Sequence, residues 1–204
     1  MGKKINIPYK FPKNEQTIIS NNFLTHTDWE KSIFDNIKES IRKYLRTQQG
    51  NRCCYCKQEL GFDIKRVDIE HIIPKSKFNQ FTFHPKNLAL SCPACNTIKS
   101  TNCVLIKNSI KRYPINGSNF KIIHAHYDDY STHITILEDC IYTPKSKKGS
   151  ETITICELYR LSVVEENAKK FQTSQSRIAK LVEDLRTAKT ELPELFKELK
   201  MALD

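Results

Sequence analysis

Apolar residues recur with two different periods along this chain, and together they predict an α+β protein. Residues 28–46 carry bulky apolar side chains at i, i+3 and i+4 spacing, which predicts an amphipathic helix that ends at Gly50. We expect Thr27 and Glu30 to form a capping box at its start. Residues 1–26 show neither helical nor strand periodicity, so we expect an extended arm that lies against a neighbouring part of the protein.

The middle of the chain has the pattern of two short strands joined by a polar loop. Residues 67–73 are rich in β-branched side chains, and residues 88–91 form a short apolar run, so each segment predicts a strand. Pro93 suits the first turn of a following helix. That helix would carry Asn96 and Lys99, three residues apart, on one side.

The last third of the chain changes from strand-like to helical patterning. Turn signals, including one over residues 147–150, alternate with strand-like stretches at 133–136 and 152–155 and predict a small β-rich excursion. From Val163 a helical period predicts one long helix, with a shorter one after Pro193. The expected regions are an N-terminal arm and helix (1–50), a central core (51–112), the β-rich excursion (113–156) and a helical tail (157–204) that could dock a partner.

Positive charge is concentrated in the first two regions. The chain carries a formal net charge of +10 at pH 7. Residues 51–120 hold eleven Lys or Arg residues and four Asp or Glu residues, whereas residues 157–204 hold nine of each kind. Such a basic region attracts phosphate backbones, so nucleic acid is the expected partner.

The sequence predicts a cytoplasmic protein whose eight cysteines are metal ligands and buried thiols. No apolar run approaches the roughly 20 residues that span a bilayer, and no apolar signal core follows the N-terminus, so we expect a cytoplasmic protein with no membrane contact. Thiols stay reduced in that compartment, which favours metal ligands and buried thiols over disulfides. Cys103, Cys140 and Cys156 have no regular partners and are interpreted as small buried hydrophobic residues.

Two Cys-x-x-Cys pairs supply the ligand set of a tetrahedral zinc ion. They are separated by 35 residues. Four thiolates leave no open coordination position, so such an ion is structural, and the chemistry must come from other residues. Cys54 is interpreted as a bystander, because two residues between ligands close the chelate with less strain. The predicted ligands are Cys53, Cys56, Cys92 and Cys95.

Glu70 and His71 are the first candidates for chemistry. Neighbouring side chains leave a strand on opposite faces, but at the end of a strand both can approach one site. The carboxylate suits Mg²⁺, and a neutral imidazole can take a proton from water. A second cluster, made of His124, His126 and His133, also contains metal-ligand types, but its turn-like context favours a structural polar role.

The order of motifs between Arg52 and Ser100 resembles that of the HNH endonucleases. Cysteine knuckles, Glu-His-Ile-Ile-Pro, Asn-Leu and Cys-x-x-Cys-Asn-x-x-Lys follow one another in that order. The resemblance implies a ββα-metal core, in which a β-hairpin and a helix clasp a metal ion. It also implies His71 as general base, Asn87 as the residue that orients its ring, and Glu70 and Asn96 as ligands of a catalytic metal ion. Glu stands where Asp often precedes the histidine, and Asn stands where His often closes the motif.

This resemblance implies a nuclease that uses one Mg²⁺ or Mn²⁺ ion to hydrolyse phosphodiester bonds, with DNA as the expected substrate. Lys75, Lys77 and Lys99 could hold flanking phosphates as point charges. More widely, the chain resembles the HNH subunits of Septu and retron anti-phage systems, which work beside an ATPase. Two alternatives remain, a catalytically inactive zinc-stabilised DNA-binding module and, less favoured, thiol redox chemistry at Cys53 and Cys56.

Overall fold

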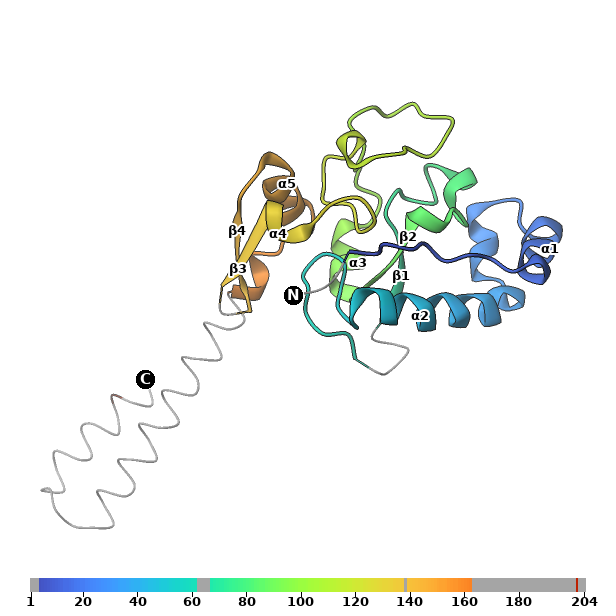
Figure 1. Cartoon of the computed structure of the whole chain (residues 1–204), viewed down its shortest axis with the longest axis horizontal. Coiled ribbons are helices and arrows are strands. Elements are labelled where there is room, and N and C mark those ends of the chain that lie inside the picture. The colour runs from blue at the N-terminus through green and yellow to red at the C-terminus, as the bar shows by residue number, and fades with distance from the viewer. Residues whose placement is uncertain (1–3, 62–66, 138, 163–200, 202–204) are drawn as a thin grey trace, which may run out of the picture. The chain divides into compact units, whose positions relative to one another are not determined.

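Two short strands lie at the centre of the first part of the chain. In the computed structural model, β1 (Asp68–His71) pairs antiparallel with β2 (Leu88–Ser91), so that His71 lies opposite Leu88. α2 (Asp35–Gln49) packs against both strands, and α3 (Pro93–Lys99) packs against β1 (Figure 1). Both predicted strands and the helix that begins at Pro93 are therefore confirmed, as is the α+β class.

The structure describes residues 4–61, 67–137, 139–162 and 201. The chain divides into two compact units, Met1–Leu158 and Tyr159–Asp204. The helices predicted from Val163 onward fall almost wholly outside the described residues. The division into four regions remains a prediction.

The first unit contains short helical segments around the two strand pairs. Apart from the central hairpin and its two helices, these elements are α1 (Lys13–Asn22), η1 (His26–Glu30), η2 (Ser32–Phe34), η4 (Asn79–Phe81), η5 (Pro85–Asn87), η6 (Gly117–Asn119), α4 (Tyr130–His133), β3 (Ile134–Leu137), β4 (Ile141–Pro144) and α5 (Lys147–Ile155). Among the described residues, none of the helices is both long and apolar enough to cross a membrane.

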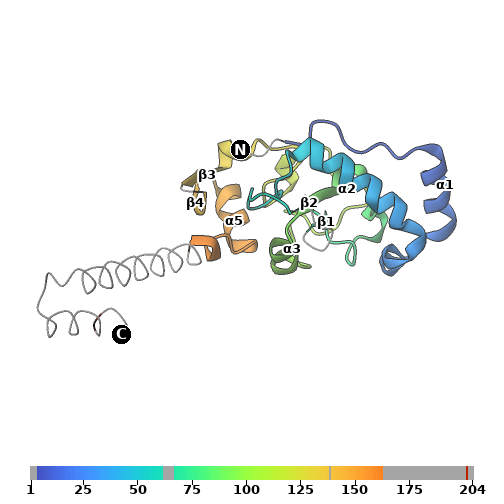
Figure 2. The same ribbon diagram turned by 90° about the horizontal axis from the view of Figure 1, so that it is seen from below.

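α2 buries an apolar stripe against the hairpin, but it begins later than predicted. Its buried residues include Ile37, Ile41 and Leu45, and Gly50 ends it in the left-handed conformation at φ 60°. The predicted start near residue 28 is wrong, because the chain around Trp29 forms 3-10 turns that break at an extended Lys31. Figure 2 shows α2 beside the two strands from a second direction.

The capping box lies two residues earlier than the sequence indicated. It joins Thr25 and Asp28, so the predicted pairing of Thr27 with Glu30 is wrong. The Asp28 carboxylate accepts hydrogen bonds from the backbone N–H groups of Leu24 and Thr25, at 2.8 and 2.9 Å. These backbone donors, followed by Lys31, lower the pKa of Asp28 to about 2.

The N-terminal arm is only partly extended. Ile5 is buried, and its N–H donates to the carbonyl of Ala125, so residues 4–12 lie against a neighbouring segment as expected. Lys13–Asn22, however, is the helix α1, which corrects the prediction of an arm over residues 1–26. Only Glu15 of this helix is buried, where it accepts the Tyr9 hydroxyl, so the helix has no apolar stripe that sequence periodicity could detect.

The excursion contains one confirmed hairpin and one incorrectly predicted strand. β3 and β4 pair antiparallel and pack with α4 and α5 (Figure 1). The segment 152–155, predicted as a strand, is the end of α5, and the turn predicted at 147–150 is its first turn. Gly149 marks a close approach between elements, because a Cβ atom there would lie 2.0 Å from the carbonyl oxygen of His133.

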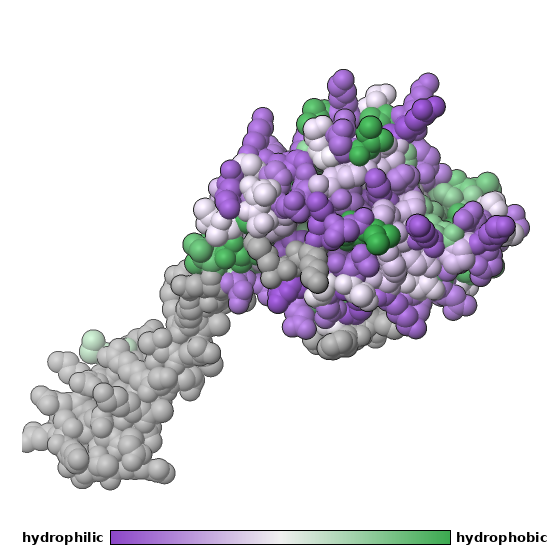
Figure 3. All heavy atoms as spheres, in the orientation of Figure 1, coloured by the Kyte–Doolittle hydropathy of each residue, from purple (hydrophilic) through white to green (hydrophobic). Residues whose placement is uncertain are grey.

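Polar side chains dominate the exposed surface of this unit. The described atoms in Figure 3 are mostly hydrophilic, and the hydrophobic ones form small separated patches. The larger apolar side chains are instead buried along α2, β2 and the segments that cross them. A broad apolar patch is therefore absent from the described part of the face that Figure 3 shows.

Candidate functional site

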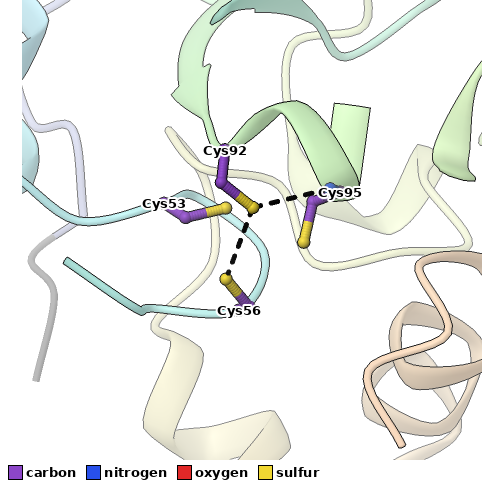
Figure 4. A group of neighbouring side chains, drawn as sticks. All are labelled: Cys53, Cys56, Cys92 and Cys95. Carbon is purple, nitrogen blue, oxygen red and sulfur yellow. Dashed lines mark hydrogen bonds between the residues drawn. The ribbon is translucent and has the colours of Figure 1, made fainter. Parts of the chain in front are cut away.

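The four predicted zinc ligands converge in one cluster. The Sγ atoms of Cys53, Cys56, Cys92 and Cys95 all lie within 4.8 Å of one another (Figure 4). The second pair comes from the end of β2 and the first turn of α3, where the Cys92 sulfur also accepts the Cys95 N–H at 3.5 Å. Four clustered thiols fit the donor set of a structural zinc ion. Cys54 is buried outside this cluster, as expected for a bystander.

Tyrosine hydroxyls from the excursion hold the first cysteine pair. Tyr130 donates to the carbonyl of Tyr55 at 2.7 Å, and Tyr142 donates to the carbonyl of Cys56 at 2.6 Å. The ammonium of Lys57 lies over the Tyr130 ring, 4.5 Å from its centroid. The sequence contained no local signal for these contacts, because each joins residues more than 70 positions apart.

A cavity of about 640 Å³ is lined by residues of β1, α2 and α3. It contains five of the predicted site residues, and it also contains Asp68 and two basic residues of α2 that sequence reasoning missed. The lining residues with charged or chemically active side chains are His26, Trp29, Glu30, Lys38, Arg42, Asp68, Glu70, His71, Lys75, Asn96 and Lys99. Asn87 and Lys77 are not among the described residues that line it.

His71 is buried with its ring held from two sides. The ring packs edge-on against Trp29 at 4.6 Å between centroids, and Nε2 lies 3.2 Å from the carbonyl oxygen of Thr82. Burial, with the positive charges of Lys75 and Lys99, lowers the pKa of His71 to about 3, so the ring is neutral at pH 7. Because a carbonyl can only accept, Nε2 carries the proton and Nδ1 retains its lone pair.

Asn87 acts on the backbone around His71 and not on the ring itself. Its amide nitrogen donates to the carbonyls of Ile73 and Phe81, both at 3.0 Å, and its oxygen accepts the Ile73 N–H at 2.7 Å. Among the described residues, the ring contacts the Thr82 carbonyl, one residue beyond Phe81. Asn87 therefore fixes the loop that holds the imidazole.

Glu70 is engaged in a buried ion pair. Its Oε1 lies 2.5 Å from the Lys99 ammonium and accepts the Tyr55 hydroxyl at 2.9 Å. Lys99 also donates to the carbonyl of His71 at 2.7 Å. Burial raises the pKa of Glu70, and the ammonium of Lys99 opposes that rise. The lysine predicted to hold a phosphate is only 1% exposed and is occupied within the protein.

Asn96 and Asp68 complete the set of oxygen donors. The Asn96 amide nitrogen donates to Asp68 Oδ2 at 2.8 Å, which brings α3 onto β1. Asp68 was missed, although a signal existed, because residues two apart on a strand share a face and Asp68 lies two before Glu70. The carboxylates of both residues and the amide of Asn96 are hard oxygen donors of the type that Mg²⁺ or Mn²⁺ prefers.

The remaining predicted residues have less direct roles. The Lys75 ammonium pairs with Glu30 at 3.2 Å, and Lys77 is exposed. Both ring nitrogens of His124 are engaged, by the Tyr113 hydroxyl at 2.9 Å and the His126 N–H at 3.1 Å. Within the described ranges, the four cysteines form the one group of at least three metal-ligating side chains, so the structure does not bring the second histidine cluster together as a metal site.

Comparisons with known proteins agree on the central segment. Residues 53–102 match the family of HNH endonucleases. The chain is 28% identical to the Septu protein PtuB of Bacillus thuringiensis over 78% of its own length and 54% of the relative's. For Septu protein PtuB of Bacillus mycoides (strain KBAB4) the identity is 27%, over 81% of this chain and 62% of the relative.

A third relative is a retron Vc95 protein of Vibrio cholerae serotype O1 biovar El Tor. It is 32% identical over 94 residues, which are 41% of this chain and 45% of the relative. The chain thus spans about half the length of the curated relatives that it matches. No solved structure matches it.

Proposed function

We propose that the cavity beside His71 hydrolyses phosphodiester bonds of DNA. The match of residues 53–102 to the HNH endonuclease family and the similarity of the chain to Septu PtuB proteins support this proposal. The observation that carries the proposal is the state of the His71 ring. It is neutral, it donates from Nε2 to the Thr82 carbonyl, and it keeps Nδ1 as an acceptor in a cavity lined by oxygen donors. A fixed neutral imidazole is the group that a general base requires.

His71 would take the proton of a water molecule at Nδ1 as that water attacks phosphorus. The P–O bond to the departing 3′ oxygen then breaks, and that oxygen takes a proton from solvent water, so a 5′ phosphate and a 3′ hydroxyl result. Glu70 and Asn96, with Asp68 beside them, would hold a divalent ion, which when bound supplies positive charge to the phosphate oxygens. Asn87 would keep the base in place through the loop that ends at Thr82.

The buried ion pair between Glu70 and Lys99 favours a second candidate, a zinc-stabilised DNA-binding module without catalysis. The carboxylate already has a cation as partner, so a metal ion would have to displace the Lys99 ammonium or share Glu70 with it. DNA binding alone would not require that exchange. The two functions differ in one measurement, namely whether strands are cut.

Cleavage of supercoiled plasmid in Mg²⁺ or Mn²⁺ tests the proposal. We expect nicking or cutting by the wild type, and a fall in rate of about 10²- to 10⁴-fold in His71→Ala. His133→Ala is the matched control, because His133 is a partly exposed histidine outside the cavity lining. Zinc content should stay near one ion per chain in all three proteins. Equal rates in wild type and His71→Ala would exclude His71 as the base, and binding without any cutting would favour the module.

We also propose that the nuclease serves anti-phage defence beside an ATPase partner. The support is the similarity to Septu PtuB proteins, together with the charge-balanced segment 157–204, which was expected to dock a partner and lies largely outside the described residues. Phage plating on cells that express the chain with and without an adjacent ATPase gene tests this. Protection that requires both genes and His71 is the expected result.

A further inference from the structure

The cavity beside His71 is lined by four cationic side chains. Two of them, Lys38 and Arg42, come from α2, one turn apart on the helix face beside the strands. The other two follow β1 and end α3. The four are Lys38, Arg42, Lys75 and Lys99.

The three lysines already have carboxylate partners. The ion pairs are Lys38 with Asp35 at 2.7 Å, Lys75 with Glu30 at 3.2 Å, and Lys99 with Glu70 at 2.5 Å. A phosphate that approached any of these ammonium groups would have to replace or share an existing anion. Each lysine therefore gains less from a phosphate than an unpaired cation would.

Arg42 differs from these lysines. Among the described residues it forms no ion pair with a carboxylate, and its Nε is buried without a hydrogen-bond partner. The guanidinium is always charged and presents a planar set of donors that matches the oxygens of a phosphate. An N–H donor kept from water costs free energy unless an acceptor meets it. The Nε–H group of Arg42 is therefore a buried donor that an anionic oxygen could meet.

We propose that Arg42 is the phosphate-binding residue of this cavity, and that it donates to a non-bridging oxygen of the nucleic-acid strand whose scissile bond lies at His71. The inference rests on the proposed function for the identity of the strand. It assigns the phosphate contact to a residue of α2 and not to Lys75, Lys77 or Lys99, the lysines that the sequence indicated. Lys77 is exposed outside the cavity lining, and Lys75 and Lys99 are already paired.

Binding measured without cleavage tests this assignment. The full chain carrying His71→Ala would be titrated against fluorescent duplex DNA, single-stranded DNA and RNA between 50 and 300 mM salt. We expect Arg42→Gln to weaken binding about ten-fold and to reduce the slope of log Kd against log salt by about one. Arg42→Lys keeps the charge but not the fork, so it should recover part of the loss.

Lys43→Gln is the matched control. Lys43 is the next residue of α2, its side chain is 76% exposed, and its loss removes the same charge from a position outside the cavity lining. It should change affinity less than two-fold. Thermal midpoints and zinc contents of all variants must match, which excludes a folding effect. Equal losses in Arg42→Gln and Lys43→Gln would overturn the assignment, as would failure of all three nucleic acids to bind.

Cleavage by the variants with His71 intact separates this inference from the proposed function. If both hold, Arg42→Gln raises KM and leaves most of kcat. If the wild type cuts DNA and Arg42→Gln has an unchanged KM, the proposed nuclease function stands and the assignment of Arg42 is overturned. If the wild type never cuts nucleic acid but binds it in a way that depends on Arg42, the assignment of Arg42 stands and the proposed nuclease function is overturned.

Discussion

The cysteine cluster and the cavity beside His71 share one hairpin and one helix, yet their side chains are satisfied in different ways. The cluster gathers four thiols of one kind from two short motifs, and a single zinc ion would satisfy all of them. In the cavity three of the polar side chains each have a different partner: Glu70 is met by Lys99, Asn96 by Asp68, and His71 by the Thr82 carbonyl. One shared zinc ion would thus hold the whole cluster, whereas these cavity side chains are held by separate pairs within the chain.

This difference predicts how each region responds to loss of one member. Removing one thiol should disable the whole cluster, because four ligands share one ion. Removing one member of a pair in the cavity should leave a single unpaired group and the rest of the cavity intact.

The largest effect is expected at the cluster. Cys92→Ala should abolish zinc binding and leave the first unit largely unfolded, because metal binding at such sites is coupled to folding. Cys103→Ser is the control, since Cys103 lies outside the cluster. Zinc analysis and circular dichroism measure the outcome. A Cys92→Ala protein that retains its zinc or its thermal midpoint would show that the cluster is not the structural metal site.

The next effect is expected at the buried ion pair. Lys99→Met leaves the Glu70 carboxylate buried without its cation, which should lower the free energy of unfolding by about 3 to 5 kcal/mol. The double variant Glu70→Gln with Lys99→Met should recover much of that loss, because neither charge remains. Urea unfolding of the four proteins gives the coupling energy. Additive losses in the double variant would mean that the two side chains do not depend on each other.

Sequence reasoning succeeded where residue type and local spacing determine the structure. The zinc ligands follow from two Cys-x-x-Cys motifs, the strands from β-branched and apolar runs, and the start of α3 from Pro93. The Glu-His pair on β1 lines the cavity together with three other residues selected from the sequence. In each case short motifs of a recognisable residue type carry the signal.

It failed where a contact crosses the chain. A backbone carbonyl, that of Thr82, holds the His71 ring, and no side-chain motif encodes it. Gln49 ends α2 and also pairs with the backbone of Leu90 on β2 through both ends of its amide, 41 positions away. The sequence likewise held no signal for the pairing of Lys99 with Glu70. Burial and pairing decided these roles, and both are properties of the folded chain.

A pH-dependent effect distinguishes the buried histidines from the clustered thiols. Burial lowers the pKa of His126 from its usual 6.5 to about 4, while its hydrogen bond to the Leu88 carbonyl opposes that shift. Below pH 6.5 the unfolded chain therefore binds a proton that the folded chain does not, so stability falls as the pH falls toward 4. Between pH 7.5 and pH 5 we expect this residue to account for a loss of about 2 kcal/mol.

His126→Gln keeps a side-chain donor for the Leu88 carbonyl and removes the titration. Denaturant unfolding at the two pH values should show a shallower loss for this variant than for the wild type. His133→Gln, a change at a partly exposed histidine, should keep the wild-type dependence. An equal loss in wild type and His126→Gln would assign the acid sensitivity to other groups, the zinc thiols among them.

The smallest expected change in stability tests whether hydrogen bonds outside the cavity lining help to hold the general base. His124 donates from Nε2 to the Tyr113 hydroxyl, since its Nδ1 accepts the His126 N–H, and the Tyr113 hydroxyl reaches Lys86 and Asn87 at 3.0 and 3.3 Å. Tyr113→Phe should cost about 1 kcal/mol of stability and loosen Asn87, which holds the loop at Thr82.

A lower kcat with unchanged KM is the expected kinetic result, because the substrate contacts stay in place while the general base is held less firmly. Tyr127→Phe is the matched control, since its hydroxyl reaches only the Pro114 carbonyl among the described residues. If both variants lose the same stability and neither loses kcat, Tyr113 is structural alone. A fall in kcat confined to Tyr113→Phe would instead show that the β-rich excursion positions the general base through Asn87.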